Sequence, residues 1–164
     1  MKTLNRKNDG ITVINLLPRF KFPHIAAKKS VIKVFEHFRY RTENVNIVFM
    51  GDSDITHINV QYLNHNCPTD VISFRLNEGK KVEAELYIGI EEVRRNSKYF
   101  KTTFYEEVQR VIIHGALHLI GFEDDTTEKR DFMRKWEDRF LKNTKKRGRN
   151  SKVKSNASAR LSNR

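Results

Sequence analysis

Hydrophobic and polar positions alternate with two different periods along this chain. A period of two, typical of strands in a sheet, recurs in four stretches, and a period near 3.6, typical of helices with one apolar face, recurs in five. The predicted strands are residues 11–18, 45–52, 69–76 and 82–90. The predicted helices are residues 24–39, 53–62, 91–99, 103–120 and 127–141. This order predicts an α+β fold with one small mixed four-stranded sheet backed by helices.

Turn and capping residues predict where several elements end. The glycine-containing segment NEGKK joins the last two strands and favours an antiparallel hairpin. Ser53 or Asp54 is expected to cap the second helix. Thr103, with a glutamate three residues later, is typical of a capping box at the start of the fourth helix. Gly121 is expected to end that helix in the left-handed conformation.

Apolar residues at helical spacing predict which helix faces are buried. A chain of 164 residues can bury a sizeable core without disulfides or metals, and we expect a single domain over residues 1–141. The predicted buried stripes are Ile25, Ile32, Phe35 and Phe38; Ile55, Ile58 and Tyr62; and Phe132, Met133, Trp136 and Phe140.

Cysteine content and hydropathy exclude several classes of protein. Cys67 is the only cysteine, which excludes an intramolecular disulfide and a cysteine-based zinc knuckle. No stretch approaches the roughly 20 apolar residues that span a bilayer. We therefore expect a soluble cytoplasmic protein without a membrane partner.

The net charge of +12 is distributed very unevenly. Residues 142–164 contain nine Lys and Arg and no acid, whereas residues 1–141 contain 23 bases and 20 acids. The tail has almost no large apolar side chain, so burial cannot offset its ordering entropy, and we expect it to be disordered. It could be a solubilising extension or an arm that binds RNA phosphates without sequence preference.

The segment HGALHLIGFEDD, residues 114–125, has the spacing of a metal site. His114 and His118 are four residues apart, so on a helix their imidazoles point from one face. Gly121 allows the chain to reverse and to bring Asp124 back as a third ligand. Three protein ligands with one open position are typical of a catalytic zinc site, although iron, manganese or nickel also accept this donor set. The alternative is two buried histidines bonded to backbone carbonyls, followed by acids that cap the next helix.

The residue after the first histidine argues against one class of zinc enzyme. Peptidases with the HExxH motif place their general base, a glutamate, directly after that histidine. Gly115 occupies this position here. A peptidase is therefore disfavoured.

Two separated motifs resemble those of the bacterial YbeY-type rRNA maturation endoribonucleases. HGALHLIGFEDD is similar to the family signature HGxLHLxGYDH, and TDVISF at residues 69–74 is similar to TDVLSF. The segment INVQYLNHNCPTDVISF also keeps the family's spacing between the two motifs. The resemblance covers roughly residues 11–141 and omits the tail.

This resemblance implies a zinc-dependent endoribonuclease that favours single-stranded RNA and acts in 16S rRNA 3′-end maturation and ribosome quality control. It implies an rRNA precursor and the small ribosomal subunit as partners, with no DNA substrate. His114 and His118 match the first two zinc ligands of the family. An alternative function is a ribosome-associated assembly or adaptor protein with a structural metal and weak or no cleavage activity.

Several positions depart from the family pattern. Asp124 stands where the family usually has histidine, and Leu63 stands where it usually has arginine. Arg75 or His65 could replace the missing cation. The family's GDI motif reads Ala84, Glu85, Leu86 and keeps only the acid. Asp70 and Ser73 match family positions, and we expect them to fix the hairpin against the metal-bearing helix.

Overall fold

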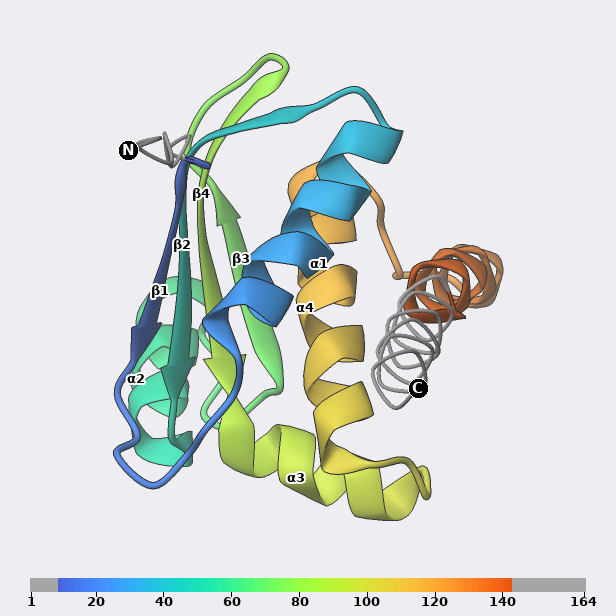
Figure 1. Ribbon diagram of the computed structural model, residues 1–164. Coiled ribbons are helices and arrows are strands. Elements are labelled where there is room, and N and C mark those ends of the chain that lie inside the picture. Colours follow the sequence, from blue (N-terminus) through green and yellow to red (C-terminus); the bar gives the residue numbers. More distant parts are fainter. Residues whose placement is uncertain (1–8, 143–164) are drawn as a thin grey trace, which may run out of the picture.

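A mixed four-stranded sheet forms the centre of the protein, for which the structure is a computed structural model describing residues 9–142 (Figure 1). The strands are β1 (Ile11–Asn15), β2 (Arg41–Met50), β3 (Val71–Arg75) and β4 (Lys81–Gly89), in the order β1-β2-β4-β3. β1 pairs with β2 and β2 with β4 in parallel, whereas β3 and β4 form the antiparallel hairpin. The predicted mixed sheet is confirmed.

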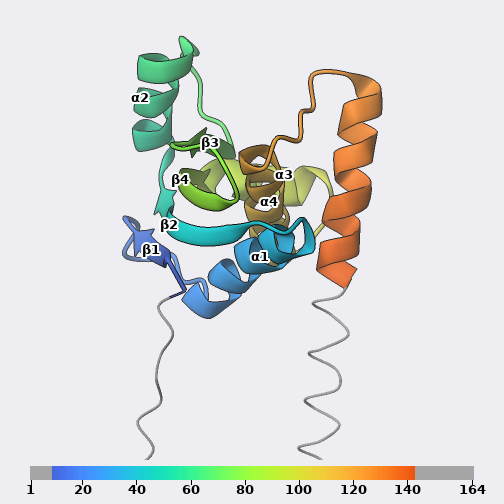
Figure 2. The ribbon, with the colours of Figure 1, turned by 90° about the horizontal axis from the view of Figure 1, so that it is seen from above.

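Helices cover both faces of this sheet (Figure 2). They are α1 (His24–His37), α2 (Asp52–Leu63), α3 (Ile90–Tyr99), α4 (Phe104–Leu119) and a C-terminal helix over residues 127–142. α2 lies alone on one face, α1 and α4 lie on the other, and the C-terminal helix packs on the far side of α4. α4 is thus the inner helix of the larger layer, and ten of its residues are buried.

Two hydrophobic clusters, one on each face of the sheet, hold these layers together. The larger one joins α1, α4 and the C-terminal helix to the sheet and includes Phe35, Leu86, Ile112 and Met133. The smaller one lies under α2 and is built from Val48, Met50, Ile55 and Ile72. The alternation of β4 explains the division, since Val82, Ala84, Leu86 and Ile88 all point into the larger cluster.

Strand boundaries differ from the prediction where side chains or pairing partners intervene. β1 ends at Asn15 rather than residue 18, because the Asn15 side chain accepts from the Leu17 amide and donates to the Phe20 carbonyl, turning the chain. β2 begins four residues early, at Arg41, because the long neighbouring strand β4 offers pairing partners from Lys81 onward.

The predicted cap of α2 is wrong. Gly51 is the N-cap residue, and neither Ser53 nor Asp54 caps this helix. The Glu91 carboxylate, from the start of α3, accepts from the Asp52 amide at 2.6 Å. This partner lies 39 residues away in sequence, so no local pattern indicates it.

Three of the residues assigned to buried stripes are exposed. Ile25, Tyr62 and Phe132 expose 67%, 61% and 54% of their surface. Ile25 lies in the first turn of α1, and Tyr62 lies in the last turn of α2, where its ring contacts Phe74 of β3 and still stays exposed. The remaining stripe residues are buried or half-buried as predicted.

The ends of α4 form as the sequence predicts. The Thr103 hydroxyl accepts from the Glu106 amide at 3.1 Å. Gly121 has φ +100°, and its amide donates to the His118 carbonyl while the Phe122 amide donates to the Leu117 carbonyl. This pair of bonds is the Schellman motif, which reverses the chain after the helix.

The predicted disordered tail, residues 142–164, lies outside the described residues except for Lys142. Within residues 9–142, no helix combines the length and the apolarity needed to cross a bilayer.

Candidate metal centre

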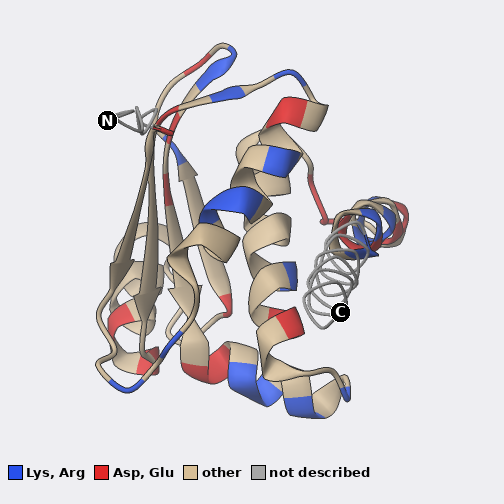
Figure 3. Cartoon of the chain, in the orientation of Figure 1, with Lys and Arg blue, Asp and Glu red and all other residues tan. Residues whose placement is uncertain are grey.

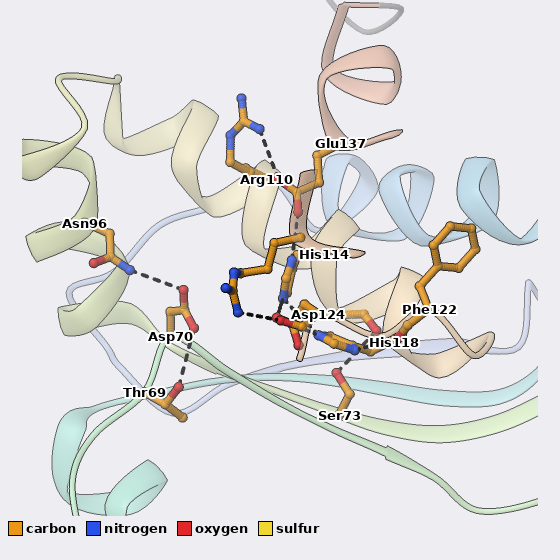
Figure 4. Close-up of polar contacts among 12 residues, drawn as sticks. Thr69, Asp70, Ser73, Asn96, Arg110, His114, His118, Phe122, Asp124 and Glu137 are labelled. Atoms are coloured by element: carbon orange, nitrogen blue, oxygen red, sulfur yellow. Dashed lines mark hydrogen bonds and ion pairs between the residues drawn. The ribbon is translucent and has the colours of Figure 1, made fainter. Parts of the chain in front are cut away.

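His114 and His118 lie in the last two turns of α4, where their rings converge (Figure 4). The two Nε2 atoms are 3.0 Å apart. This closeness follows from the four-residue spacing, which stacks the side chains on one helix face. Both side chains are about a quarter exposed, at 26% and 28%.

The turn at Gly121 brings Asp124 back to the same point. The Oδ2 atom of Asp124 lies 3.5 Å from His114 Nε2 and 3.6 Å from His118 Nε2. The predicted reversal therefore occurs, and residue 124 rather than Glu123 or Asp125 provides the third group. Glu123 and Asp125 instead pair with Lys129.

The second nitrogen of each imidazole is held by an acceptor. His114 Nδ1 donates to Glu137 Oε1 at 2.7 Å, and His118 Nδ1 donates to the Phe122 carbonyl at 2.8 Å. Because carboxylate and carbonyl oxygens only accept, each neutral ring carries its proton on Nδ1. The Nε2 lone pairs are then free to bind an ion.

The charges around His114 act on its protonation. Burial favours the neutral ring, but the hydrogen bond and charge of Glu137, together with the charges of Asp70 and Asp124, raise the pKa of His114 above its ordinary value. Burial likewise opposes the ionised form of Glu137, but His114 and Arg110 lower the pKa of this carboxyl. In the absence of a metal, a proton therefore competes for His114.

These three side chains fit a divalent ion. Their donor atoms all lie within 4.8 Å of one another. The separations of 3.0, 3.5 and 3.6 Å resemble those between ligands bound at about 2.0–2.2 Å to one tetrahedral ion. Partial exposure of all three side chains leaves room for a further ligand. The group could hold a metal ion through two nitrogens and one oxygen.

Gly115 allows α4 to approach the sheet closely. A Cβ atom at this position would lie 2.3 Å from Leu86 Cδ1 and 2.9 Å from Val71 Cγ2. The Ser73 hydroxyl donates to the Gly115 carbonyl at 3.3 Å, which ties β3 to the helix as expected. The position that carries the catalytic glutamate in HExxH peptidases therefore has no space for a side chain.

Asp70, at the start of β3, lies beside the metal centre in a cleft of about 170 Å³ that His114 and Asp124 also line. Its carboxylate accepts from the Asn96 side chain at 3.2 Å, so Asp70 is bonded to α3 and not, as predicted, to the metal-bearing helix α4 (Figure 4). Burial raises the pKa of Asp70 above the ordinary carboxyl value, and the charge of His114 opposes this only in part. A carboxyl with a raised pKa takes up a proton more readily than an ordinary one.

The other candidate residues are placed outside this cleft. Arg75 donates to the carbonyls of Leu119 and Gly79 and to the Asn77 side chain, so its guanidinium joins the hairpin to the end of α4. His65 is exposed in the loop after α2, and Leu63 ends that helix with 46% exposure. Glu85, the acid kept from the family's GDI motif, accepts from Asn46 on β2.

Sequence reasoning missed Glu137 and Arg110. Glu137 is only 7% exposed and is bonded to both His114 and Arg110. One sequence signal was available: Glu137 is four residues from buried Met133 and four from buried Leu141, so it is an acid on the apolar face of its helix. A buried acid at such a position requires a partner.

Known proteins resemble this chain in sequence and in fold. A family model described as Endoribonuclease YbeY matches residues 19–145. The Endoribonuclease YbeY of Chloroherpeton thalassium is 38% identical over 129 residues, 79% of this chain and 92% of that protein. That of Flavobacterium psychrophilum is 45% identical over 98 residues, 60% of this chain and 70% of that protein. The solution structure of TM1509 from Thermotoga maritima superposes with a TM-score of 0.56 at 24% identity, covering 84% of this chain and 93% of that one, which shows a shared fold.

Proposed function

The chain belongs to the endoribonuclease YbeY family, and from this membership we propose that it is a metal-dependent endoribonuclease that hydrolyses phosphodiester bonds in single-stranded RNA. The convergence of His114 Nε2, His118 Nε2 and Asp124 Oδ2 beside an open cleft carries the proposal. A flexible single strand can bend a phosphodiester into such a cleft more easily than a stiff duplex can.

We propose zinc as the metal. Two imidazole nitrogens and one carboxylate oxygen are ligands that zinc accepts, and three protein ligands are typical of its catalytic sites. When bound, zinc supplies Lewis acidity that lowers the pKa of water and polarises a phosphoryl oxygen. Asp124 adds a negative charge that the histidine usual in the family lacks, and this favours harder divalent ions more than a three-histidine set does.

The chain's own residues orient the ligands and handle the proton. Glu137 and the Phe122 carbonyl bond to Nδ1 of the two imidazoles and so leave each Nε2 available to hold an ion. Asp70 lies in the same cleft, and its raised pKa keeps it able to take up and release a proton at its carboxyl oxygens. We assign Asp70 this proton-transfer role.

The proposed biological substrate is the 3′ end of 16S rRNA in its precursor, with the small ribosomal subunit as partner, in the cytoplasm.

Leu63 favours a second candidate, an assembly or adaptor protein whose metal is structural, because it removes the arginine that the family usually places after Tyr62. The two candidates differ in what the metal does. In the enzyme the metal is needed for turnover, and in the adaptor it is needed for folding or binding.

One experiment separates the two. Metal content and cleavage of a single-stranded RNA are measured for the wild type, His114→Ala and His118→Ala, with folding checked by circular dichroism. We expect about one zinc per wild-type chain and, in both variants, loss of the metal and of cleavage with the fold retained. His57→Ala, which removes an exposed histidine of α2, is the matched control and should cut RNA as the wild type does.

Two outcomes would contradict the enzyme proposal. A folded, metal-free His114→Ala variant that cuts RNA at the wild-type rate would remove the role of the metal in turnover. Unfolding of both metal-free variants, with no cleavage by the wild type, would favour the adaptor.

A further inference from the structure

A groove leads away from the metal centre between the α3–α4 turn and the C-terminal helix. The cleft that contains His114 and Asp124 shares five lining residues with a second cavity of about 260 Å³, which reaches Thr102 and Asp138. The two cavities are therefore neighbours that share a wall, and together they are named here the lateral groove. The shared residues are Phe100, Glu107, Arg110, Arg134 and Glu137.

The acids of the lateral groove already have partners. Glu107 accepts from the Thr102 hydroxyl, and Asp70 accepts from Asn96. Glu137 is bonded to His114 and Arg110, and Asp138 is paired with Arg110. Arg110 pairs with two of these acids, Glu137 and Asp138, whereas the partners of Glu107 and Asp70 are neutral hydrogen-bond donors.

Arg134 differs from the other arginines of the groove. Arg110 is committed to Glu137 and Asp138, and Arg130 donates to the Asp124 carbonyl and the Thr127 hydroxyl. Within residues 9–142, Arg134 makes no hydrogen bond or ion pair, and it is exposed. Figure 3 shows Lys and Arg positions along the C-terminal helix, which carries Arg134. An uncommitted guanidinium in a groove beside a metal centre is suited to a phosphate.

An exposed aromatic ring lies in the same groove. Phe100, at the end of α3, lines both cavities and exposes 54% of its surface. Aromatic rings that alternate with cations are the usual means by which proteins hold single-stranded nucleic acid, because every base has a face to stack on. Phe100 and Arg134 supply one of each in a single groove.

We propose that the lateral groove holds a nucleotide next to the scissile phosphodiester, with Arg134 binding its phosphate and Phe100 stacking on its base. The inference rests on the proposed endoribonuclease function.

The test compares Arg134→Gln and Phe100→Leu with matched controls. Lys135→Gln removes the neighbouring cation of the same helix, which does not line the groove, and Tyr105→Leu removes a half-exposed aromatic that packs against Phe22 instead. The zinc-loaded proteins are assayed on a short single-stranded RNA for kcat and KM. Binding of the same RNA is followed by fluorescence anisotropy across a range of salt concentrations.

We expect each groove variant to raise KM and the dissociation constant by about tenfold, with kcat changed less than threefold. Arg134→Gln should also reduce the dependence of log K on log salt by about one. The wild type should bind an RNA that lacks one base beside the cleavage site about as weakly as Phe100→Leu binds the intact RNA. Phe100→Leu should bind both RNAs with the same affinity. Both controls should match the wild type.

The proposal is overturned if Arg134→Gln and Phe100→Leu keep the wild-type affinity and salt dependence, or if the controls weaken binding equally. Binding is measured separately from cleavage, so the groove proposal and the endoribonuclease proposal can fail separately. A wild type that binds but does not cut RNA would contradict the endoribonuclease, whereas groove variants that bind normally would contradict only the groove.

Discussion

Each of the two histidines of the candidate metal centre, His114 and His118, is oriented by an acceptor outside α4. For His114 the acceptor is Glu137, whose pKa is held low enough for it to remain ionised at neutral pH. We predict that Glu137→Gln weakens zinc binding by about 10–100-fold, because an amide holds the ring less strongly and lacks the charge that increases its basicity. Competition with a chelating dye measures this affinity.

Asp138→Asn is the matched control for this prediction. Asp138 is the neighbouring acid and also pairs with Arg110, but it does not contact His114. It should keep the wild-type zinc affinity. If both variants bound zinc equally weakly, the effect would come from Arg110 or the helix and not from the orientation of His114.

Asp70 leads to a prediction in which stability and activity change in opposite directions. Asp70→Asn should lower kcat by on the order of 10²-fold, because it removes a proton-transferring carboxyl. The same change should raise the melting temperature at neutral pH, because burial raises the pKa of Asp70 and so makes its ionised form costly in the folded protein.

The sign of the pH dependence follows from this direction. A carboxyl whose folded pKa lies above its unfolded value supports the fold below the unfolded pKa, and this support is lost as the pH rises through the folded pKa. The melting-temperature advantage of Asp70→Asn should therefore shrink as the pH falls through about 4, below which Asp70 becomes protonated in both states. A constant advantage across this range would contradict the assignment.

At the level of elements, the contact between α4 and the sheet depends on one glycine. We predict that Gly115→Ala destabilises the fold by about 1–3 kcal/mol, because its Cβ would overlap Leu86 and Val71 in a packed core. Urea unfolding monitored by circular dichroism gives this difference. An unchanged or higher stability, as expected for an ordinary helical Gly→Ala change, would mean that α4 can move away from the sheet without cost.

Gly121→Ala provides the contrasting variant at the end of the same helix. No atom lies within 4 Å of its Cβ position, but φ is +100°. We predict a loss of about 1 kcal/mol from backbone strain alone. Because this turn brings Asp124 to the histidines, zinc affinity should fall more than stability does.

The elements also show how far sequence reasoning reaches. The convergence of His114, His118 and Asp124 was predictable because they fall within eleven residues of one helix and its turn, where spacing alone determines geometry. The acceptor for the Asp52 amide at the start of α2 and the acceptor for His114 were not predictable. They are Glu91 and Glu137, which lie 39 and 23 residues away in the sequence. Local periodicity places side chains on faces of an element, but it does not determine which distant face packs against them.

Over the whole molecule, charge is divided between a nearly balanced domain and a strongly basic end. Removing residues 143–164 takes away eight cations and no acid, while every residue of the metal centre and the lateral groove remains. Each cation that contacts RNA phosphate releases counterions, so its loss makes log K depend less steeply on log salt.

We therefore predict that the truncated protein binds single-stranded RNA more weakly at low salt and with a shallower salt dependence, while kcat stays within about twofold of the wild type because the chemistry is confined to the domain. If the groove and the basic end bind separate phosphates, a truncation that also replaces Arg134 should show both decreases in slope added together. Full-length and truncated proteins with the same salt slope would show that the basic end takes no part in binding RNA. The steering of RNA toward the metal centre would then depend on the domain's own arginines.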